Sequence, residues 1–380
     1  MTDWNAWAGG ELDALRAVHR FRHPVTFDGD GPDGNVEGRR LLSFASNDYL
    51  GLASHTRVRA AAICAIERFG AGSMASRLIV GTRSLHCELE SAIAVWKHAE
   101  RALVFSSGYA ANLGVLATLG EQDVTLFSDE LNHASIIDGC RLAKARTLIY
   151  RHLDLEHLAT LLKQSPGRKI VVTESVFSMD GDSAPLQQLA QLCVEHGALL
   201  VLDEAHAVLG PTLQPLGDLQ VLHVGTLSKT LGSLGGFVAG SSRLIELLIN
   251  RARTFIFTTG LSPADTAAAL AAVQICESQE GQQLRERLRA RIDMLQPGHP
   301  SAIVPVIFGE DAAALAAAAK LRDVGIHVPA IRPPTVPPGT ARLRVALSAS
   351  HTEAMVTRLR QALDPLAAPP PNRINATANV

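Results

Sequence analysis

The 380-residue sequence is poor in aromatic residues and has neither a long apolar run nor a marked excess of charge of one sign. Its 11 Phe, 3 Trp and 3 Tyr are too few for the stacking platforms that bind single-stranded nucleic acid. The net charge of -2 gives no basic surface for a phosphate backbone. No apolar run reaches the roughly 18 residues that a membrane-spanning helix needs. We therefore expect a protein that binds neither nucleic acid nor membrane.

Cysteine is scarce as well, and the five cysteines are scattered without a CxxC pair. Together with an amino terminus that lacks a signal-peptide pattern, this favours buried thiols in a reducing cytoplasm. No paired Cys/His spacing appears, so no metal site is expected. The sequence also lacks the GxSxG elbow of the serine hydrolases.

Short apolar strands alternate with helical segments through the middle of the chain, which predicts an α/β fold with a mostly parallel sheet. An amphipathic arm is predicted over residues 11–22. The strands are predicted at residues 102–105, 124–127, 147–150, 169–175, 198–202, 221–225 and 237–240. The predicted organisation is an N-terminal arm (1–45), a large domain (46–285), a smaller α+β C-terminal domain (286–366) and a disordered tail (367–380).

A single lysine follows the strand predicted at residues 221–225, in the stretch VLHVGTLSKTLGSLGGFVAG. Open α/β sheets bind ligands at the carboxyl ends of their strands, where Lys229 is expected to lie. Another predicted strand leads into Asp203 and His206, in the sequence DEAH. Taken singly, Lys229 is better explained as a surface residue, and Asp203 equally well as a helix cap. Taken together, they supply the carboxylate and the Schiff-base lysine that pyridoxal phosphate chemistry requires.

Three other predicted strands also end in small or polar residues. Gly108 and Tyr109 open a helix after one strand, where free N–H groups and the helix dipole favour a phosphate. His133 and Ser178 follow two more. Each has an ordinary alternative, because small-residue turns are common and a histidine at a strand end is often a turn residue. All four residues are suited to binding one cofactor, pyridoxal phosphate.

Several segments of this sequence resemble the α-oxoamine synthases, pyridoxal phosphate enzymes of fold type I. The resemblance runs from about residue 10 to 365. It is carried by SNDYLGL, SSGYAAN, NHAS, TESVFSMDGDSAPL, DEAH, TLSKTLG and IRPPTVPPGTARLR. It implies a two-domain enzyme with pyridoxal 5'-phosphate as cofactor, working as a homodimer with shared active sites.

The resemblance also implies a role for each matching residue. Lys229 would form the Schiff base, Asp203 would hold the pyridine nitrogen and His133 would cover the ring, and these three are the expected catalytic residues. The other expected cofactor contacts are Ser178, His206, Gly108, Tyr109 and Thr226, with Thr258 and Thr259 reaching the phosphate of the neighbouring subunit. The expected substrate contacts are Arg344, Asn47, Arg20, His133 and Thr335.

Within that family the sequence is most similar to the branch that condenses L-alanine with a pimeloyl thioester, carried by coenzyme A or by an acyl carrier protein. Sister enzymes that use glycine are the alternative, and a silent binding protein is disfavoured by the intact Lys229, Asp203 and His206. Two departures affect the expected pocket: DEAHAVLG is shorter than the family pattern, and Met74 and Ala75 replace glycines. From the residues alone, Arg344 has a plainer explanation as a surface arginine.

Overall fold

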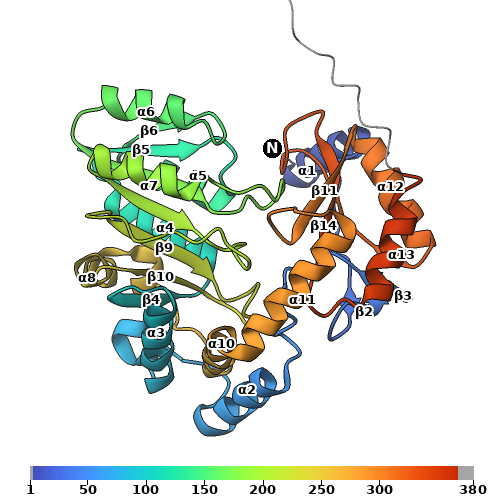
Figure 1. Ribbon diagram of the computed structural model, residues 1–380, viewed down its shortest axis with the longest axis horizontal. Coiled ribbons are helices and arrows are strands. Elements are labelled where there is room, and N and C mark those ends of the chain that lie inside the picture. The colour runs from blue at the N-terminus through green and yellow to red at the C-terminus, as the bar shows by residue number, and fades with distance from the viewer. Residues whose placement is uncertain (1–2, 367–380) are drawn as a thin grey trace, which may run out of the picture.

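The structure is a computed structural model that describes residues 3–366, so the predicted disordered tail, residues 367–380, lies outside the described residues. It contains sheets of seven, four and three strands. Figure 1 shows the seven-stranded sheet and its helices on one side of the molecule and the smaller sheets on the other. Among the helices of the described part, none is long and apolar enough to cross a bilayer.

The seven-stranded sheet confirms the predicted mostly parallel α/β architecture. Its order is β4-β10-β9-β8-β7-β5-β6, and only β10 runs antiparallel to its neighbours. All seven strands lie where the apolar runs predict them. Their bounds are β4 (Arg101–Phe105), β5 (Val124–Asp129), β6 (Arg146–Tyr150), β7 (Arg168–Glu174), β8 (Ala198–Asp203), β9 (Val221–Thr226) and β10 (Gly236–Gly240).

Helices cover both faces of this sheet, which explains why its strands are continuously apolar rather than alternating. In β4, for example, Leu103 and Phe105 pack on one face, while Ala102 and Val104 pack on the other. The first face is covered by α4 (Gly108–Leu119), α5 (Ala134–Leu142), α8 (Ser242–Arg251) and α9 (Arg253–Ile256). The second is covered by α3 (Ser84–Trp96), α6 (Leu155–Gln164), α7 (Leu186–Glu195) and α10 (Pro263–Cys276).

The reversed direction of β10 explains a glycine in the TLSKTLGSLGG stretch. Because β10 is antiparallel, its first residue, Gly236, lies at the edge where the neighbouring strands end. A Cβ at Gly236 would collide with the backbone of Ser107 and with the amide nitrogen of Gly108. The amino terminus of α4 therefore packs directly on backbone, and only glycine fits between them.

The C-terminal part of the chain forms the other lobe. An antiparallel sheet joins β11 (Ile303–Gly309), β14 (Ala341–Ala346) and β13 (Ala330–Ile331). Helix α12 (Asp311–Asp323) packs against this sheet, and α13 (Glu353–Leu363) packs against α11 (Gln279–Leu295). The predicted boundary between residues 285 and 286 falls inside α11, which continues across it without a break. The domain boundaries remain predictions.

The N-terminal segment shares a sheet with the C-terminal part. Strands β1 (Phe27–Asp28), β2 (Asp33–Val36) and β3 (Arg39–Ser43) pair in sequence, and β3 then pairs in parallel with β12 (Ile326–His327). The arm helix is shifted from its predicted range, because α1 spans Trp4–Ala17 and the left-handed His19 (φ 58°) follows its end. The remaining elements are α2 (Thr56–Phe69) and a π-helix, η1 (Arg77–Gly81).

Candidate active site

Strands β5, β7, β8 and β9 are neighbours in the sheet, so the polar residues that follow them meet at one edge. This arrangement brings Lys229 to His206, with 2.8 Å between the lysine Nζ and the histidine Nε2. Asp203, at the end of β8, is buried beside them. The predicted convergence of Asp203, His206 and Lys229 is therefore present in the structure.

A chain of hydrogen bonds connects the lysine to an arginine from the other lobe. His206 Nδ1 lies 2.6 Å from the Tyr49 hydroxyl, and that hydroxyl lies 3.1 Å from Asn47 Oδ1. Asn47 Oδ1 also accepts a hydrogen bond from Arg344 Nη2 at 3.1 Å. Arg344 Nε donates to the carbonyl oxygen of Ser178 at 2.6 Å.

Donor and acceptor accounting fixes the direction of every bond in this chain. Asn47 Oδ1 has no proton, so Tyr49 must donate to it, and the single hydroxyl proton of Tyr49 is thereby used. His206 must then donate from Nδ1 to the tyrosine oxygen. Its Nε2 is left as an acceptor, which accepts a hydrogen bond from the Lys229 amino group. The contacts therefore select one tautomer of a neutral histidine.

The electrostatic surroundings support the same assignment. Burial, reinforced by the charges of Lys229 and Arg344, holds the pKa of His206 well below its usual value, so the ring is neutral. Burial raises the pKa of Tyr49 to about 12, so its hydroxyl keeps its proton. Burial also lowers the pKa of Lys229, against the attraction of Asp203 and Glu174. A lysine with a lowered pKa is a better nucleophile and base near neutral pH.

Asp203 is held by a side chain of α4 and by a backbone amide of the turn that follows β8. Its Oδ2 accepts from Asn112 Nδ2 at 2.7 Å, and its Oδ1 accepts from the amide of Ala205 at 2.9 Å. The same Asn112 Nδ2 donates to Ser135 Oγ at 2.9 Å. Within residues 3–366, the buried Oδ1 of Asn112 has no hydrogen-bond partner. A buried acceptor without a partner beside a fixed carboxylate is typical of a site that a ligand completes.

Glu174, the last residue of β7, is a member of this site that the sequence analysis did not single out. It pairs in register with Asp203, and its Oε1 accepts from the amide of His133 at 2.7 Å. Burial, together with the nearby Asp203 charge, holds the pKa of Glu174 well above its usual value. Glu174 and Tyr49 lie in the family-like segments TESVFS and SNDYLGL, which were the only sequence signal for them.

The predicted phosphate position lies at the amino terminus of α4. A Cβ on Gly108 would come within 3.2 Å of Thr226 Cβ, so these two residues face each other closely. The hydroxyls of Thr226 and Ser228 are 2.7 Å apart beside them. Tyr109 is turned outward: its hydroxyl donates to Asp138, and its ring lies 6.4 Å from that of His133. Helix N–H groups and two hydroxyls form a suitable anion cradle.

Four of the predicted site residues stand apart from this group. Arg20 pairs with Asp311 (3.3 Å), and Thr335 lies exposed in a loop. Thr259 bridges to Ser76, and Thr258 precedes it. In the described part of the chain, no hydrogen bond joins any of the four to the group around Lys229.

Arg344 is not a surface residue, so the plainer explanation offered by the sequence pattern is wrong. Both Arg344 and its neighbour on the same face, Arg342, are at most 5 % exposed. Strand spacing alone suggests a solvent-exposed face, but a hairpin of residues 176–183, which follows β7, packs against it and accepts hydrogen bonds from both guanidinium groups.

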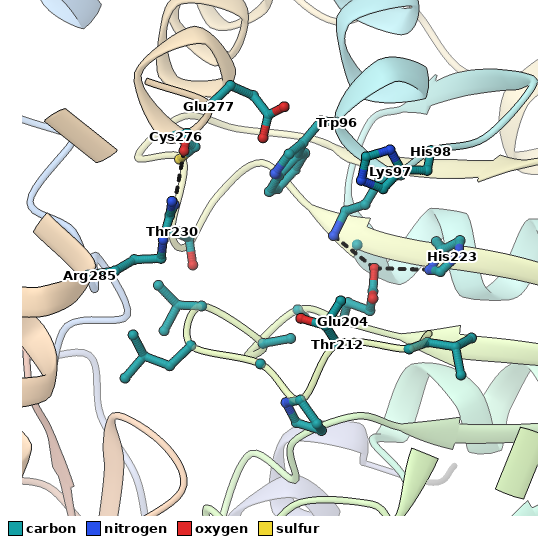
Figure 2. A pocket seen from close by; sticks show the side chains of 18 of the residues that line it. Trp96, Lys97, His98, Glu204, Thr212, His223, Thr230, Cys276, Glu277 and Arg285 are labelled. Carbon is teal, nitrogen blue, oxygen red and sulfur yellow. Dashed lines mark hydrogen bonds and ion pairs between the residues drawn. The ribbon is translucent and has the colours of Figure 1, made fainter. Parts of the chain in front are cut away.

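A cleft of about 1020 Å³ is lined by Glu204, Ala205 and Ala207, the neighbours of His206 in the chain. Figure 2 shows Glu204 at this cleft. Of the predicted site residues, the cleft is lined only by Thr226; residues 207–217, from the shortened DEAHAVLG region onward, form much of its wall. On one side, Lys97 and His223 approach the buried Glu204 carboxylate at 2.8 and 3.3 Å. This cluster supports the loop beside Asp203 but does not contact Lys229.

Comparison with known proteins identifies the family. The model of the aminotransferase class I and II family matches residues 39–363. A curated 8-amino-7-oxononanoate synthase from Anaeromyxobacter dehalogenans (strain 2CP-1) is 50% identical over 378 residues, 94% of each chain. Another, from Geobacter sulfurreducens, is 46% identical over 371 residues, 92% of this chain and 95% of its own. The chain belongs to the aminotransferase class I and II family and, within it, to the family of 8-amino-7-oxononanoate synthases.

Solved structures agree on the fold. The serine palmitoyltransferase of S. paucimobilis, solved with a bound pyridoxal phosphate–myriocin aldimine, has a TM-score of 0.89 at 30% identity, covering 96% of this chain and 98% of its own. The 8-amino-7-oxononanoate synthase of Francisella tularensis has a TM-score of 0.70 at 27% identity, covering 86% and 97%. The predicted fold type I architecture is confirmed, and the curated relatives separate the branches where fold similarity alone does not.

The Lys97–Glu204 pair generates a stability prediction. Burial alone raises the pKa of Glu204, but Lys97 and His223 outweigh it and lower the pKa to about 2. Glu204→Gln leaves Lys97 buried without its counter-charge, so we expect the variant to lose about 3 kcal/mol of unfolding free energy in urea at pH 7. Glu286→Gln, at an exposed position, should lose less than about 0.5 kcal/mol.

The contribution of Glu204 to the free energy of unfolding should decrease as the pH falls. Because the folded pKa of Glu204 is depressed below the ordinary 4.5, its contribution is complete above pH 4.5 and declines as the pH falls toward about 2. The unfolding free energy of the wild type should therefore decrease by this contribution over that pH range. The unfolding free energy of Glu204→Gln should not show this part of the decrease. Equal stabilities of Glu204→Gln and Glu286→Gln would contradict the assignment.

Proposed function

We propose that the protein condenses L-alanine with a pimeloyl thioester to give 8-amino-7-oxononanoate in biotin biosynthesis, with pyridoxal 5'-phosphate as cofactor. The thiol of the acyl carrier and carbon dioxide are released. The observation that carries the proposal is the partly buried Lys229 amine, with its lowered pKa, at a strand-end site shared with Asp203 and Arg344. The names of the curated relatives support the same activity.

The residues present fit pyridoxal phosphate. Asp203 would keep a proton on the ring nitrogen, and the buried Asn112 Oδ1 beside it lacks a hydrogen-bond partner within residues 3–366. Ser178 and His206 would contact the phenolic side, and the ring of His133 would cover the face. The cradle of Gly108, Tyr109 and Thr226 would take the phosphate. When bound, this cofactor supplies an electron sink for a carbanion at the substrate α-carbon.

Residues of the chain would bind the amino-acid substrate and remove its α-proton. Arg344 and Asn47 would bind the carboxylate of L-alanine and so orient its α-proton toward the Lys229 amine. That amine, with its lowered pKa, would remove the proton. The α-carbon would then form a bond to the thioester carbonyl carbon and the thiol would leave with a proton. Loss of the carboxyl group as carbon dioxide would let the α-carbon regain a proton. Arg20 and Thr335 would contact the acyl substrate or the carboxylate from the C-terminal side.

A homodimer completes the proposal. Thr258 and Thr259 would reach the phosphate site of a second copy. Their surroundings support this role: Phe257 (70 % exposed) is next to them, and the paired segment carries Met74 (79 %) and Ile79 (74 %). Adjacent exposed apolar side chains on paired segments mark a protein interface.

Identifying the product tests the proposed activity. The holoenzyme is mixed with L-alanine or glycine and with pimeloyl-coenzyme A or pimeloyl-acyl carrier protein, and products are identified by mass spectrometry. We expect 8-amino-7-oxononanoate from L-alanine with at least one of the two carriers. Preferential condensation of glycine would instead assign the protein to the sister enzymes.

The carboxylate clamp is tested by Arg344→Lys. A lysine lacks the planar fork of arginine, so we expect the variant to bind L-alanine about tenfold more weakly than the wild type, or weaker still. Without any thioester, the wild type should exchange the α-proton of L-alanine in deuterated water, and the variant should do so poorly. Arg322→Lys, on the surface of α12, serves as the control and should exchange like the wild type. Normal exchange by Arg344→Lys would remove Arg344 from the carboxylate site.

A further inference from the structure

A short hairpin separates the sheet edge from the C-terminal lobe and carries Ser178. It leaves β7 and is closed by a bridge between Val176 and Ser183. Phe177 and Asp182 pair across it, with 3.0 Å between the amide of the first and the carbonyl oxygen of the second. The hairpin comprises residues 176–183. Because Ser178 binds Arg344 through its carbonyl oxygen, the position of the hairpin sets that of the guanidinium group.

The C-terminal lobe holds one side of the hairpin. Arg342 pairs with Asp180 and donates to the carbonyl oxygen of Met179 at 3.3 Å. Ser301 Oγ donates to the carbonyl oxygen of Gly181 at 2.7 Å. These contacts tie the hairpin to the strand that carries Arg344, but they do not fix it to the large sheet.

His152 ties the other side of the hairpin to the sheet. Its Nε2 lies 2.9 Å from Asp182 Oδ2, and its Nδ1 lies 2.9 Å from Asp129 Oδ1, at the end of β5. Asp129 is fully buried and opens the turn that leads to His133. The ring of Phe177 packs edge-on against the imidazole at 4.4 Å. The hairpin and the turn before His133 therefore share one anchor.

Both ring nitrogens must donate, because a carboxylate can only accept. Burial lowers the pKa of His152, but the hydrogen bonds and charges of Asp129 and Asp182 outweigh it and raise the pKa to about 10. The imidazole is accordingly a charged bridge with two charge-assisted hydrogen bonds. It contacts none of the residues proposed to bind cofactor or substrate.

We propose that His152 is a positioning residue, which clamps the hairpin to the sheet through Asp129 and Asp182 and thereby holds Arg344 ready for the amino-acid carboxylate. The substrate part of this inference rests on the proposed function. The clamp itself does not.

The test uses the holoenzyme with His152→Gln. One amide group cannot donate to two carboxylates on opposite sides, so one of them is left unpaired. His157→Gln is the matched control, because His157 accepts a backbone hydrogen bond from Arg151 at 3.1 Å and contacts neither aspartate. The double variant His152→Gln/Asp182→Asn restores a matched pair, since an asparagine amide can donate to the glutamine oxygen.

The test combines amide hydrogen exchange of the hairpin with steady-state kinetics for L-alanine. In His152→Gln, amide hydrogen exchange of residues 176–183 should be about tenfold faster, the loss expected for one charge-assisted hydrogen bond. The KM for L-alanine should rise about tenfold, while kcat at saturating alanine should change less than about threefold. His157→Gln should match the wild type, and the double variant should recover most of both changes.

Three results would overturn the inference: unchanged exchange in the hairpin, faster exchange with an unchanged KM, or no recovery in the double variant. If the wild-type holoenzyme does not act on L-alanine, the proposed function fails, but hydrogen exchange still decides on the clamp. Faster exchange confined to residues 176–183 would then support it, and unchanged exchange would reject it.

Discussion

The arrangement of this site depends on burying the amino group of one lysine. Lys229 loses water on folding, and its neighbours must replace the lost hydrogen bonds without removing its reactivity. A neutral His206 satisfies this demand, because it accepts a hydrogen bond and adds no charge. Tyr49 and Asn47 then fix the histidine tautomer and extend the chain of hydrogen bonds to Arg344. The proposed base, Lys229, and the proposed carboxylate-binding group, Arg344, are thus positioned relative to each other before any ligand arrives.

The two lobes contribute different functions to this arrangement. The edge of the parallel sheet supplies Asp203, His206 and Lys229, and the antiparallel sheet of the C-terminal lobe supplies Arg344. The hairpin after β7 connects the two lobes. It accepts hydrogen bonds from Arg342 and Arg344 of the C-terminal lobe, and its Asp182 forms an ion pair with His152. A movement of one lobe would therefore be transmitted to the site through the hairpin.

The sequence predicted the strands of the large sheet well, because strands buried on both faces are continuously apolar and strand ends carry the polar residues. It did not predict the strand order or the reversed direction of β10, since both depend on contacts between distant segments. For the same reason, it could not show that β3 pairs with β12. The shift of the arm helix to Trp4–Ala17 reflects a local turn at His19 that periodicity does not report.

Within the site, residues with a distinctive strand-end context, such as Lys229 and Asp203, were predictable from the sequence. Tyr49 and Glu174 were not, because a buried tyrosine and a glutamate at the end of an apolar strand acquire their roles only through packing. The burial of Arg344 also depends on the hairpin, which strand spacing does not describe. The role proposed for Thr258 and Thr259 requires a second copy of the chain, so the packing of one chain does not define it.

The most direct test of the central claim is to locate the cofactor on the chain. Pyridoxal phosphate is added to the protein, the adduct is reduced with borohydride, and the modified peptide is identified by mass spectrometry. The burial and contacts of Lys229 predict a single reduced adduct on that residue, and none after Lys229→Ala. An adduct on Lys97 or Lys144 instead of Lys229 would contradict the account.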